Sequence, residues 1–249
     1  MTLAPVAVVD LGRRRYGEVL ELQRTLCRRR LDGLLDQDLF LLVEHHPVVT
    51  LGRGTRAASL PLPAASLTAR GLEVFEVERG GDVTVHAPGQ LVGYPILDLR
   101  RHRRDLHWYL RQLEETLICA LADSGVAAER NSGLTGVWVP GGPGGPAGPG
   151  GRKIASIGIH VKQWVTFHGF ALNVTTDLSL FDLVIPCGIP GVVMTSIARE
   201  TGAGSHPASL WAKTVEHVVQ RFGEVFEREP ERWPAERLAF SAMAPSGDG

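Results

Sequence analysis

Hydrophobic residues recur with helical spacing in three segments of the chain, at about residues 16–31, 106–122 and 207–226. In the first segment the apolar positions share one face and arginines occupy the other. In the second, leucines recur every three or four residues, and the third follows Ser205-His206-Pro207, which is typical of a helix start. Each segment therefore predicts an amphipathic helix that packs on a sheet through one apolar stripe.

Short runs of β-branched and apolar residues lie between these helices and predict strands. The runs cover residues 7–10, 39–44, 48–51, 73–78, 83–86, 91–97, 136–139, 154–161, 164–173 and 192–197. Gly, Asp and Asn between them are typical of hairpins. Because the strands come in groups and do not alternate regularly with helices, the pattern predicts the α+β class with a mixed or antiparallel sheet.

One stretch, Pro140–Gly151, is Gly or Pro at eleven of its twelve positions. Such a composition cannot build a core, so we expect a flexible surface loop between two neighbouring strands, with a domain linker as the alternative. We expect one domain over residues 1–238 and a disordered tail at 239–249.

The composition excludes several classes of protein. The 249 residues include 26 Lys and Arg against 27 Asp and Glu, so there is no global basic field for nucleic acid. No run approaches 18 apolar residues and the N-terminal apolar stretch is too short for a signal peptide, which predicts no membrane association. Three cysteines without CxxC spacing argue against a disulfide framework or a structural zinc. We expect a soluble cytoplasmic protein.

Two residues are candidates for covalent chemistry. Cys187 lies in a Pro-Cys-Gly turn, where the glycine lets a substrate approach the sulfur, although a buried structural thiol is the more frequent role of such a cysteine. Cys27 and Cys119 lie within helical stretches. Lys153 opens a strand directly after the Gly/Pro loop, and its cation would stabilise a thiolate. A solvated lysine is the alternative, and a separation of 34 positions does not place it near Cys187.

The segment from Arg79 to Pro95 is the most distinctive. An Arg-Gly-Gly turn opens a strand, and His86-Ala-Pro-Gly-Gln leads into the next. Glycines there expose backbone N–H groups to an acyl carbonyl or an extended ligand, but a plain hairpin also explains them. Residues 52–57 half match a dinucleotide-binding fingerprint. Because no apolar helical pattern follows them, we reject a Rossmann dinucleotide site. The sequence contains no HExxH, GxSxG or Walker A motif, which disfavours a metal or triad hydrolase.

Together these segments resemble the lipoyl(octanoyl) transferase family, in five blocks that follow the family's order. The blocks are residues 44–54, 79–95, 153–159, 167–174 and 186–189. The resemblance covers roughly residues 5–226. It implies a fold like the biotin and lipoate-protein ligases, with a mixed sheet, helices on one side and an acyl pocket between strands.

The resemblance also implies an activity. The family moves an octanoyl group from octanoyl-acyl-carrier protein to a lysine of lipoyl domains in 2-oxoacid dehydrogenases and of the glycine-cleavage H protein. By resemblance, Cys187 is the acyl-thioester nucleophile and Lys153 is the group that stabilises its thiolate and transfers protons. No cofactor or metal is implied. The segments that match the family's substrate-binding residues are Arg79, Gly80, Gly81, Asp82, Val83, Thr84, Val85, His86, Ser156, Ile157, Gly158, Gly169, Phe170 and Ala171. The Pro140–Gly151 stretch is longer than the family's usual hairpin.

Two other functions remain open at this point. An ATP-dependent lipoate or biotin ligase of the same fold would need an adenylate-binding loop and no acyl cysteine. A non-catalytic module that binds acyl-carrier protein or lipoyl domains would not need both Cys187 and Lys153. The arginines around Arg100–Arg104 are a candidate surface for an acidic carrier protein, with a solvated charge run as the alternative.

Overall fold

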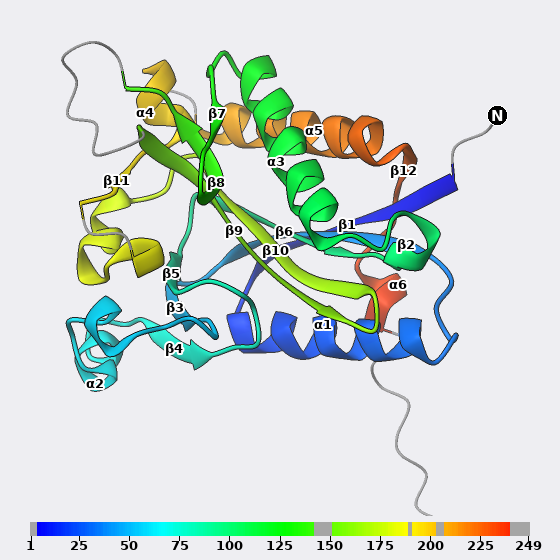
Figure 1. Ribbon diagram of the computed structural model, residues 1–249, viewed down its shortest axis with the longest axis horizontal. Helices are drawn as coiled ribbons and strands as arrows, with labels where there is room; N and C mark the ends of the chain where they lie inside the picture. The colour runs from blue at the N-terminus through cyan, green and yellow to red at the C-terminus, as the bar shows by residue number, and fades with distance from the viewer. Residues whose placement is uncertain (1–3, 142–150, 189–190, 203–206, 240–249) are drawn as a thin grey trace, which may run out of the picture.

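The main sheet runs diagonally through the molecule, as the computed structural model shows for residues 4–141, 151–188, 191–202 and 207–239 (Figure 1). Its strand order is β12-β1-β2-β6-β10-β9-β8-β7, and β11 pairs with β9 outside this path. The strands are β1 (Ala4–Arg14), β2 (Asp38–His45), β6 (Gln90–Ile96), β7 (Glu129–Asn131), β8 (Leu134–Val139), β9 (Arg152–Lys162), β10 (Val165–Asn173), β11 (Val193–Met194) and β12 (Arg228–Arg232). The pairings of β1 with β12 and with β2, and of β11 with β9, are parallel and the others are antiparallel, so the sheet is mixed.

Helices cover both faces of this sheet. Helix α1 (Tyr16–Leu31) packs on one face, against alternate residues of β1 and β2, while α3 (Leu106–Asp123) and α5 (Pro207–Phe226) pack together on the other. Figure 1 shows α1 below the sheet and the other two helices above it. The α+β fold is thus confirmed, but the expectation of helices on one side is wrong. Strands such as β2 and β6 are apolar and buried at successive positions, so both of their faces are covered. A sheet of this kind needs helices on each face.

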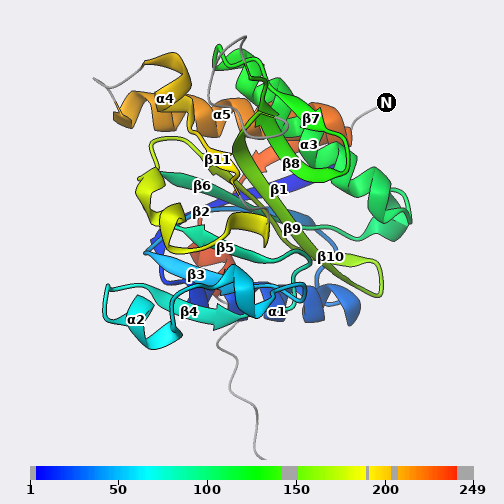
Figure 2. The same ribbon diagram turned by 60° about the vertical axis from the view of Figure 1, so that its left-hand side comes forward.

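A second, smaller sheet lies beside the main one, in the order β4-β3-β5, with β3 (Val48–Leu51), β4 (Glu73–Glu76) and β5 (Val83–His86) (Figure 2). Short helix α2 (Ala64–Thr68) and the turns η1 (Ala57–Ser59), η3 (Leu178–Leu183) and η4 (Pro186–Gly188) surround it. Val49, Val83, Val85 and Phe181 belong to its apolar core. The predicted glycine-rich turn, residues 79–81, lies between β4 and β5 and contacts strand β9 of the main sheet.

Most predicted elements are confirmed, and the differences have local causes. The strand expected over residues 192–197 is limited to Val193–Met194, because the Ser196 hydroxyl accepts a hydrogen bond from the amide of Arg199 and starts helix α4 (Ile197–Thr201). The strand expected to end at Glu78 ends at Glu76. The predictions did not include α2, α4, β7, β12 or the 3₁₀ turn η2 (Leu99–Arg101), nor α6 (Glu236–Ala239).

Strands β8 and β9 flank the Gly/Pro stretch and pair antiparallel, with Val139 opposite Arg152. Residues 142–150 and 240–249, on which the predictions of a flexible loop and a disordered tail fall, lie outside the described residues. Within the described part of the chain, no helix has the length and apolar character needed to cross a bilayer.

Candidate active site

Cys187 occupies the middle of the η4 turn in a left-handed backbone conformation, with φ 58°, and Gly188 follows with φ 65°. The turn is fixed to the loop before β5. A Cβ atom at position 188 would collide with the carboxylate of Asp82, and that carboxylate accepts a hydrogen bond from the Ser59 hydroxyl at 2.6 Å. The Ile185 amide donates to the Ser59 carbonyl at 2.9 Å. Glycine at position 188 therefore permits the close contact that seats the cysteine.

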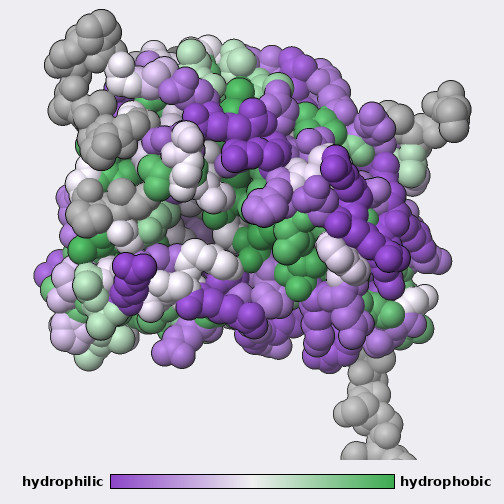
Figure 3. Space-filling model, in the orientation of Figure 1, coloured by the Kyte–Doolittle hydropathy of each residue, from purple (hydrophilic) through white to green (hydrophobic). Residues whose placement is uncertain are grey.

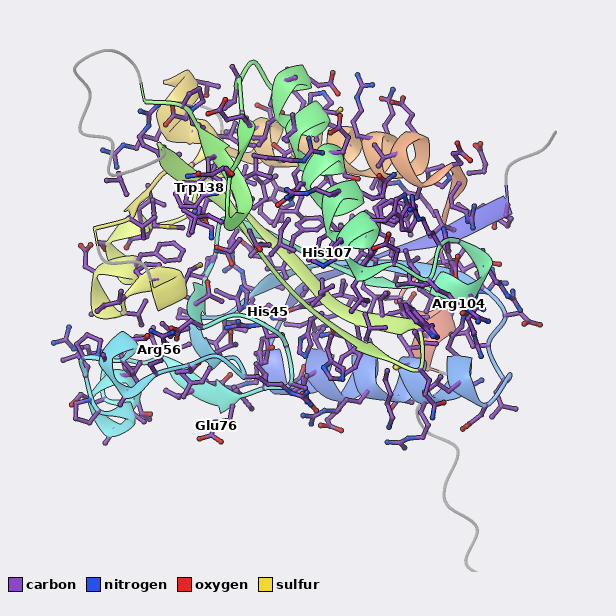
Figure 4. All side chains as sticks on the ribbon, in the orientation of Figure 1. His45, Arg56, Glu76, Arg104, His107 and Trp138 are labelled. Carbon is purple, nitrogen blue, oxygen red and sulfur yellow. The ribbon has the colours of Figure 1, made fainter. Side chains whose placement is uncertain are left out.

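Lys153 lies on β9, and only 2% of its surface is exposed. Its amine donates to the Thr135 carbonyl at 3.0 Å, and Nζ is 3.0 Å from the Cys187 sulfur. The Trp138 ring on β8 lies 5.0 Å from the same nitrogen, and Figure 4 labels this residue. An ammonium in contact with a sulfur stabilises the thiolate, which is the nucleophilic form of cysteine. The fold thus joins two residues that the sequence could not place together.

Gly136 makes room for this lysine. Its φ is 118°, and a Cβ atom there would lie 2.9 Å from Lys153 Cε and 2.6 Å from the Ala155 carbonyl oxygen. Both distances are shorter than real Cβ contacts. The position of the Lys153 amine therefore requires a glycine at position 136 of the neighbouring strand β8.

A cavity of about 220 Å³ adjoins the Lys153–Cys187 pair. Twelve of the fourteen residues predicted for substrate binding line it, all except Gly80 and Val85. The Gly80 amide instead donates to the Ile159 carbonyl at 2.8 Å, and the Val85 side chain packs in the core of the small sheet. Side chains alternate along a strand, so Thr84 and His86 face the cavity while Val83 and Val85 pack in the core of the small sheet. Val83, the first residue of β5, also borders the cavity.

Apolar side chains form part of the cavity wall, among them Leu134, Ile157 and Phe170. The Phe170 ring occupies the space that Gly93 leaves on the adjacent strand, where any Cβ atom would collide with it. Gly158 and Gly169 face each other in the β9–β10 register and also line the cavity. The cavity thus suits a small apolar group that ends near the sulfur.

Arg79 holds the loop that lines one side of the cavity. Its guanidinium donates to the carbonyl and hydroxyl of Thr50, and to the carbonyls of Gly80 and Asp82 at 3.1 and 2.7 Å. Burial lowers the pKa of Arg79. Because protein oxygens accept from all three of its nitrogens, this residue positions the glycine turn.

A chain of buried hydrogen bonds links His86 to the backbone of the lysine. His86 Nδ1 donates to Gln90 Oε1 at 2.8 Å, and Gln90 Nε2 donates to Asn173 Oδ1 at 2.9 Å. Asn173 donates to the Thr195 carbonyl at 3.0 Å, and the Thr195 amide donates to the Lys153 carbonyl at 2.9 Å. Burial lowers the pKa of His86 to about 3, so the ring is neutral and its Nε2 is an acceptor.

Six cavity residues were not among the predicted ones: Tyr16, Tyr94, Gly133, Leu134, Thr135 and His168. His168 is the most unusual. It has φ 58° within β10, it is buried, and neither ring nitrogen has a hydrogen-bond partner among the described residues. Burial lowers its pKa to about 3. A positive φ at a non-glycine residue in a strand is rare, and the sequence pattern gives no sign of it, so sequence reasoning did not single out His168.

The two other cysteines differ from Cys187. Cys27 is a buried residue of α1, and burial raises its pKa to about 11. Cys119 lies on α3 beside Glu115. Burial raises the pKa of Cys119, and the Glu115 carboxylate raises it further. No group of three or more His, Cys, Asp or Glu residues that could hold a metal occurs in the described ranges.

The chain is similar to known proteins over most of its length. Residues 15–227 match the family described as the lipoyl protein ligase A/B catalytic domain. A protein of Acidobacterium capsulatum named octanoyltransferase is 46% identical over 227 residues, which cover 88% of this chain and 89% of that protein. An octanoyltransferase of Synechococcus elongatus is 50% identical over 219 residues, covering 86% and 88%.

Among solved structures, a bipartite lipoate protein ligase from Thermoplasma acidophilum matches with a TM-score of 0.63 at 15% identity, over 96% of this chain and 91% of that one. At this identity the likeness concerns the fold alone. It confirms the predicted lipoate-protein-ligase-like mixed sheet flanked by helices.

Proposed function

The chain belongs to the lipoyl protein ligase A/B catalytic domain family and, within it, to the octanoyltransferases, and we propose that it works through an acyl-thioester on Cys187. The donor is octanoyl-acyl-carrier protein, and the acceptor is a lysine of a lipoyl domain. The single observation that carries this proposal is the 3.0 Å contact between Lys153 Nζ and Cys187 Sγ beside an apolar cavity.

In the first step the Cys187 thiolate attacks the carbonyl carbon of the octanoyl thioester. The carbon–sulfur bond to the carrier arm breaks, and the arm leaves as a thiol after it takes a proton from the Lys153 ammonium. One thioester replaces another, so this exchange is nearly thermoneutral and needs no ATP. The buried amine has the position for this proton transfer, since it already contacts the sulfur.

In the second step the neutral amine of the acceptor lysine attacks the Cys187 thioester. A carbon–nitrogen bond forms, the bond to Sγ breaks, and the neutral Lys153 amine takes the proton that the new amide loses. Formation of an amide from a thioester is thermodynamically favourable, and the step restores the Lys153 ammonium and the Cys187 thiolate. Backbone N–H groups near Ser156–Gly158 are the proposed stabilisers of the tetrahedral oxyanion.

The remaining parts of the proposal follow from the same site. Leu134, Ile157 and Phe170 hold the alkyl chain, and the turn 79–82 holds the polar end of the donor. The acceptors are lipoyl domains of 2-oxoacid dehydrogenases and of the glycine-cleavage H protein, and the reaction is the first step of endogenous protein lipoylation. A free nucleophilic thiol persists in a reducing compartment, so the proposed location is the cytoplasm.

The experiment that tests this mechanism is the intact mass of the protein after incubation with octanoyl-carrier protein. We expect wild type to gain one octanoyl group that hydroxylamine removes and that apo lipoyl domain discharges. Cys187→Ser should gain none. Cys119→Ser is the matched control, because Cys119 is also partly exposed, and it should behave as wild type.

Other outcomes would contradict the proposal. Labelling of Cys187→Ser would move the acyl group to another residue. Octanoylation of the lipoyl domain that requires free octanoate and ATP, with no adduct on wild type, would make the protein a ligase and leave Cys187 without an acyl intermediate.

A further inference from the structure

A second depression lies on the other side of the cavity wall, between α1, the loop after β3 and the β9–β10 hairpin. This basic groove has a volume of about 400 Å³. Its lining comprises Arg24, Cys27, Arg28, Leu31, Arg53, Glu78, His160, Lys162 and Phe167. Hydrophilic residues predominate over α1 in the space-filling view (Figure 3). The groove is outside the chemistry described above.

The charge of this groove is largely uncompensated. Arg24 is paired with Glu21 and Glu78, but the described residues give no ion pair to Arg28, Arg53 or Lys162. All three of these side chains are exposed. Exposed cations of one sign around a depression attract an anionic partner and increase its rate of association.

The groove and the cavity share a wall. Glu78 lines the groove, and the next residue, Arg79, lines the cavity. The Arg53 amide donates to the Arg79 carbonyl at 3.0 Å, and His160 Nδ1 donates to the Glu78 carbonyl at 3.0 Å. A partner seated in the groove would therefore lie against the loop that borders the reacting sulfur.

The arginines at 100–104, the other candidate surface, have a different environment. Arg100 pairs with Asp98 at 2.7 Å, Arg101 with Asp36 at 2.8 Å and Arg103 with Asp105 at 3.4 Å. Three of these cations are thus neutralised by their own chain, and their contribution to the attraction of a distant anion is small.

We infer that the basic groove receives the acidic, phosphate-bearing face of the acyl-carrier protein. This inference rests on the proposed function, because the carrier is the proposed donor. The phosphodiester that links the carrier to its thiol arm is the anion nearest the thioester. Arg28, Arg53 and Lys162 meet this anion and the carboxylates around it, and so orient the arm towards Cys187.

The test compares two donors with the same acyl group. We expect Arg28→Glu/Lys162→Glu to reduce kcat/KM for Cys187 acylation by octanoyl-carrier protein on the order of 10- to 100-fold, mainly through KM. Acylation by octanoyl-pantetheine, which has no phosphate and no protein, should be unchanged. Added salt should slow wild type and have little effect on the variant. Arg103→Glu/Arg104→Glu is the control with the same change of net charge, and it should keep wild-type rates.

Three results would overturn the inference. Equal losses with both donors would mean that the groove only supports the cavity. A loss confined to discharge by apo lipoyl domain would assign the groove to the acceptor. Wild-type rates in Arg28→Glu/Lys162→Glu would leave the groove without a role in docking. Failure of the proposed function is distinguishable, because wild type itself would then gain no octanoyl group from the carrier.

Discussion

The two proposed catalytic residues lie in contrasting parts of the molecule. Lys153 projects from β9, in the interior of the main sheet, between strands that pair on both sides. Cys187 lies on a 3₁₀ turn outside both sheets, and its seat consists of a few contacts to Ser59 and Asp82. The proposed proton-transfer group thus belongs to the scaffold, whereas the sulfur belongs to a local turn that packs against it. We therefore expect a change to the scaffold to affect folding and chemistry together, and a change to the turn to affect mainly chemistry.

The largest effect is expected from the lysine. Lys153→Met keeps the length of the side chain and removes the amine, so we expect octanoyl transfer to fall on the order of 10²- to 10⁴-fold. The rate at which iodoacetamide alkylates Cys187 at pH 7 should also fall, because the thiolate loses its cation. Transfer activity within tenfold of wild type would contradict the role of Lys153 in proton transfer.

The next effect separates the two regions. Gly136→Ala should reduce activity and also lower the free energy of unfolding by about 1–3 kcal/mol, since its Cβ meets the strand backbone and the lysine. Gly188→Ala should reduce activity about 10²-fold through a displaced sulfur, with a smaller change in stability. Thermal denaturation and transfer rates of both variants test this. Equal stability losses would remove the distinction between scaffold and turn.

The last effect concerns pH and acts on stability. Burial lowers the pKa of His45 to about 4 and those of His86 and His168 to about 3, against about 6.5 in the unfolded chain. Below pH 6.5 the unfolded state binds more protons than the native state, so the free energy of unfolding should fall as the pH drops from 6.5 towards 4. Urea titrations at pH 7.5 and pH 5 measure this loss.

His168→Phe sharpens the same measurement. The phenyl ring can keep the stacking on Phe167, and the substitution removes two buried nitrogens that make no hydrogen bond among the described residues. We expect the variant to lose less stability than wild type between pH 7.5 and pH 5. An unchanged loss would mean that His168 does not titrate on unfolding.

Much of the fold was predictable because its signals are local. The apolar stripe of α1 and the flanking polar residues predicted Tyr16–Leu31, and the β-branched residues of β3 and β5 predicted both strands. Strand β12 has the sequence REPER, with no apolar alternation, and it forms because β1 offers it an edge. A pairing of that kind has no local signal.

Most residues that line the candidate site were named from the sequence, but their arrangement was not. A turn and a strand end made Cys187 and Lys153 candidates, and the family resemblance gave them their expected roles. Their contact depends on the packing of η4 against the loop before β5. Tyr16 was assigned to the apolar stripe of its helix, and no periodicity shows that its ring lines a cavity. The positive φ of His168 likewise arises from tertiary contacts.

The ends of the main sheet have a consequence for solubility. In the part of the chain that the structure describes, the outermost strands of its main path are β7 and β12, of three and five residues, and both are rich in charge. β12 also contains Pro230, which donates no amide hydrogen. Short, charged edges offer a poor template for a strand from another molecule. The long apolar strands β1, β2, β6 and β10 are thereby kept inside the main sheet, which protects this sheet against edge-to-edge aggregation.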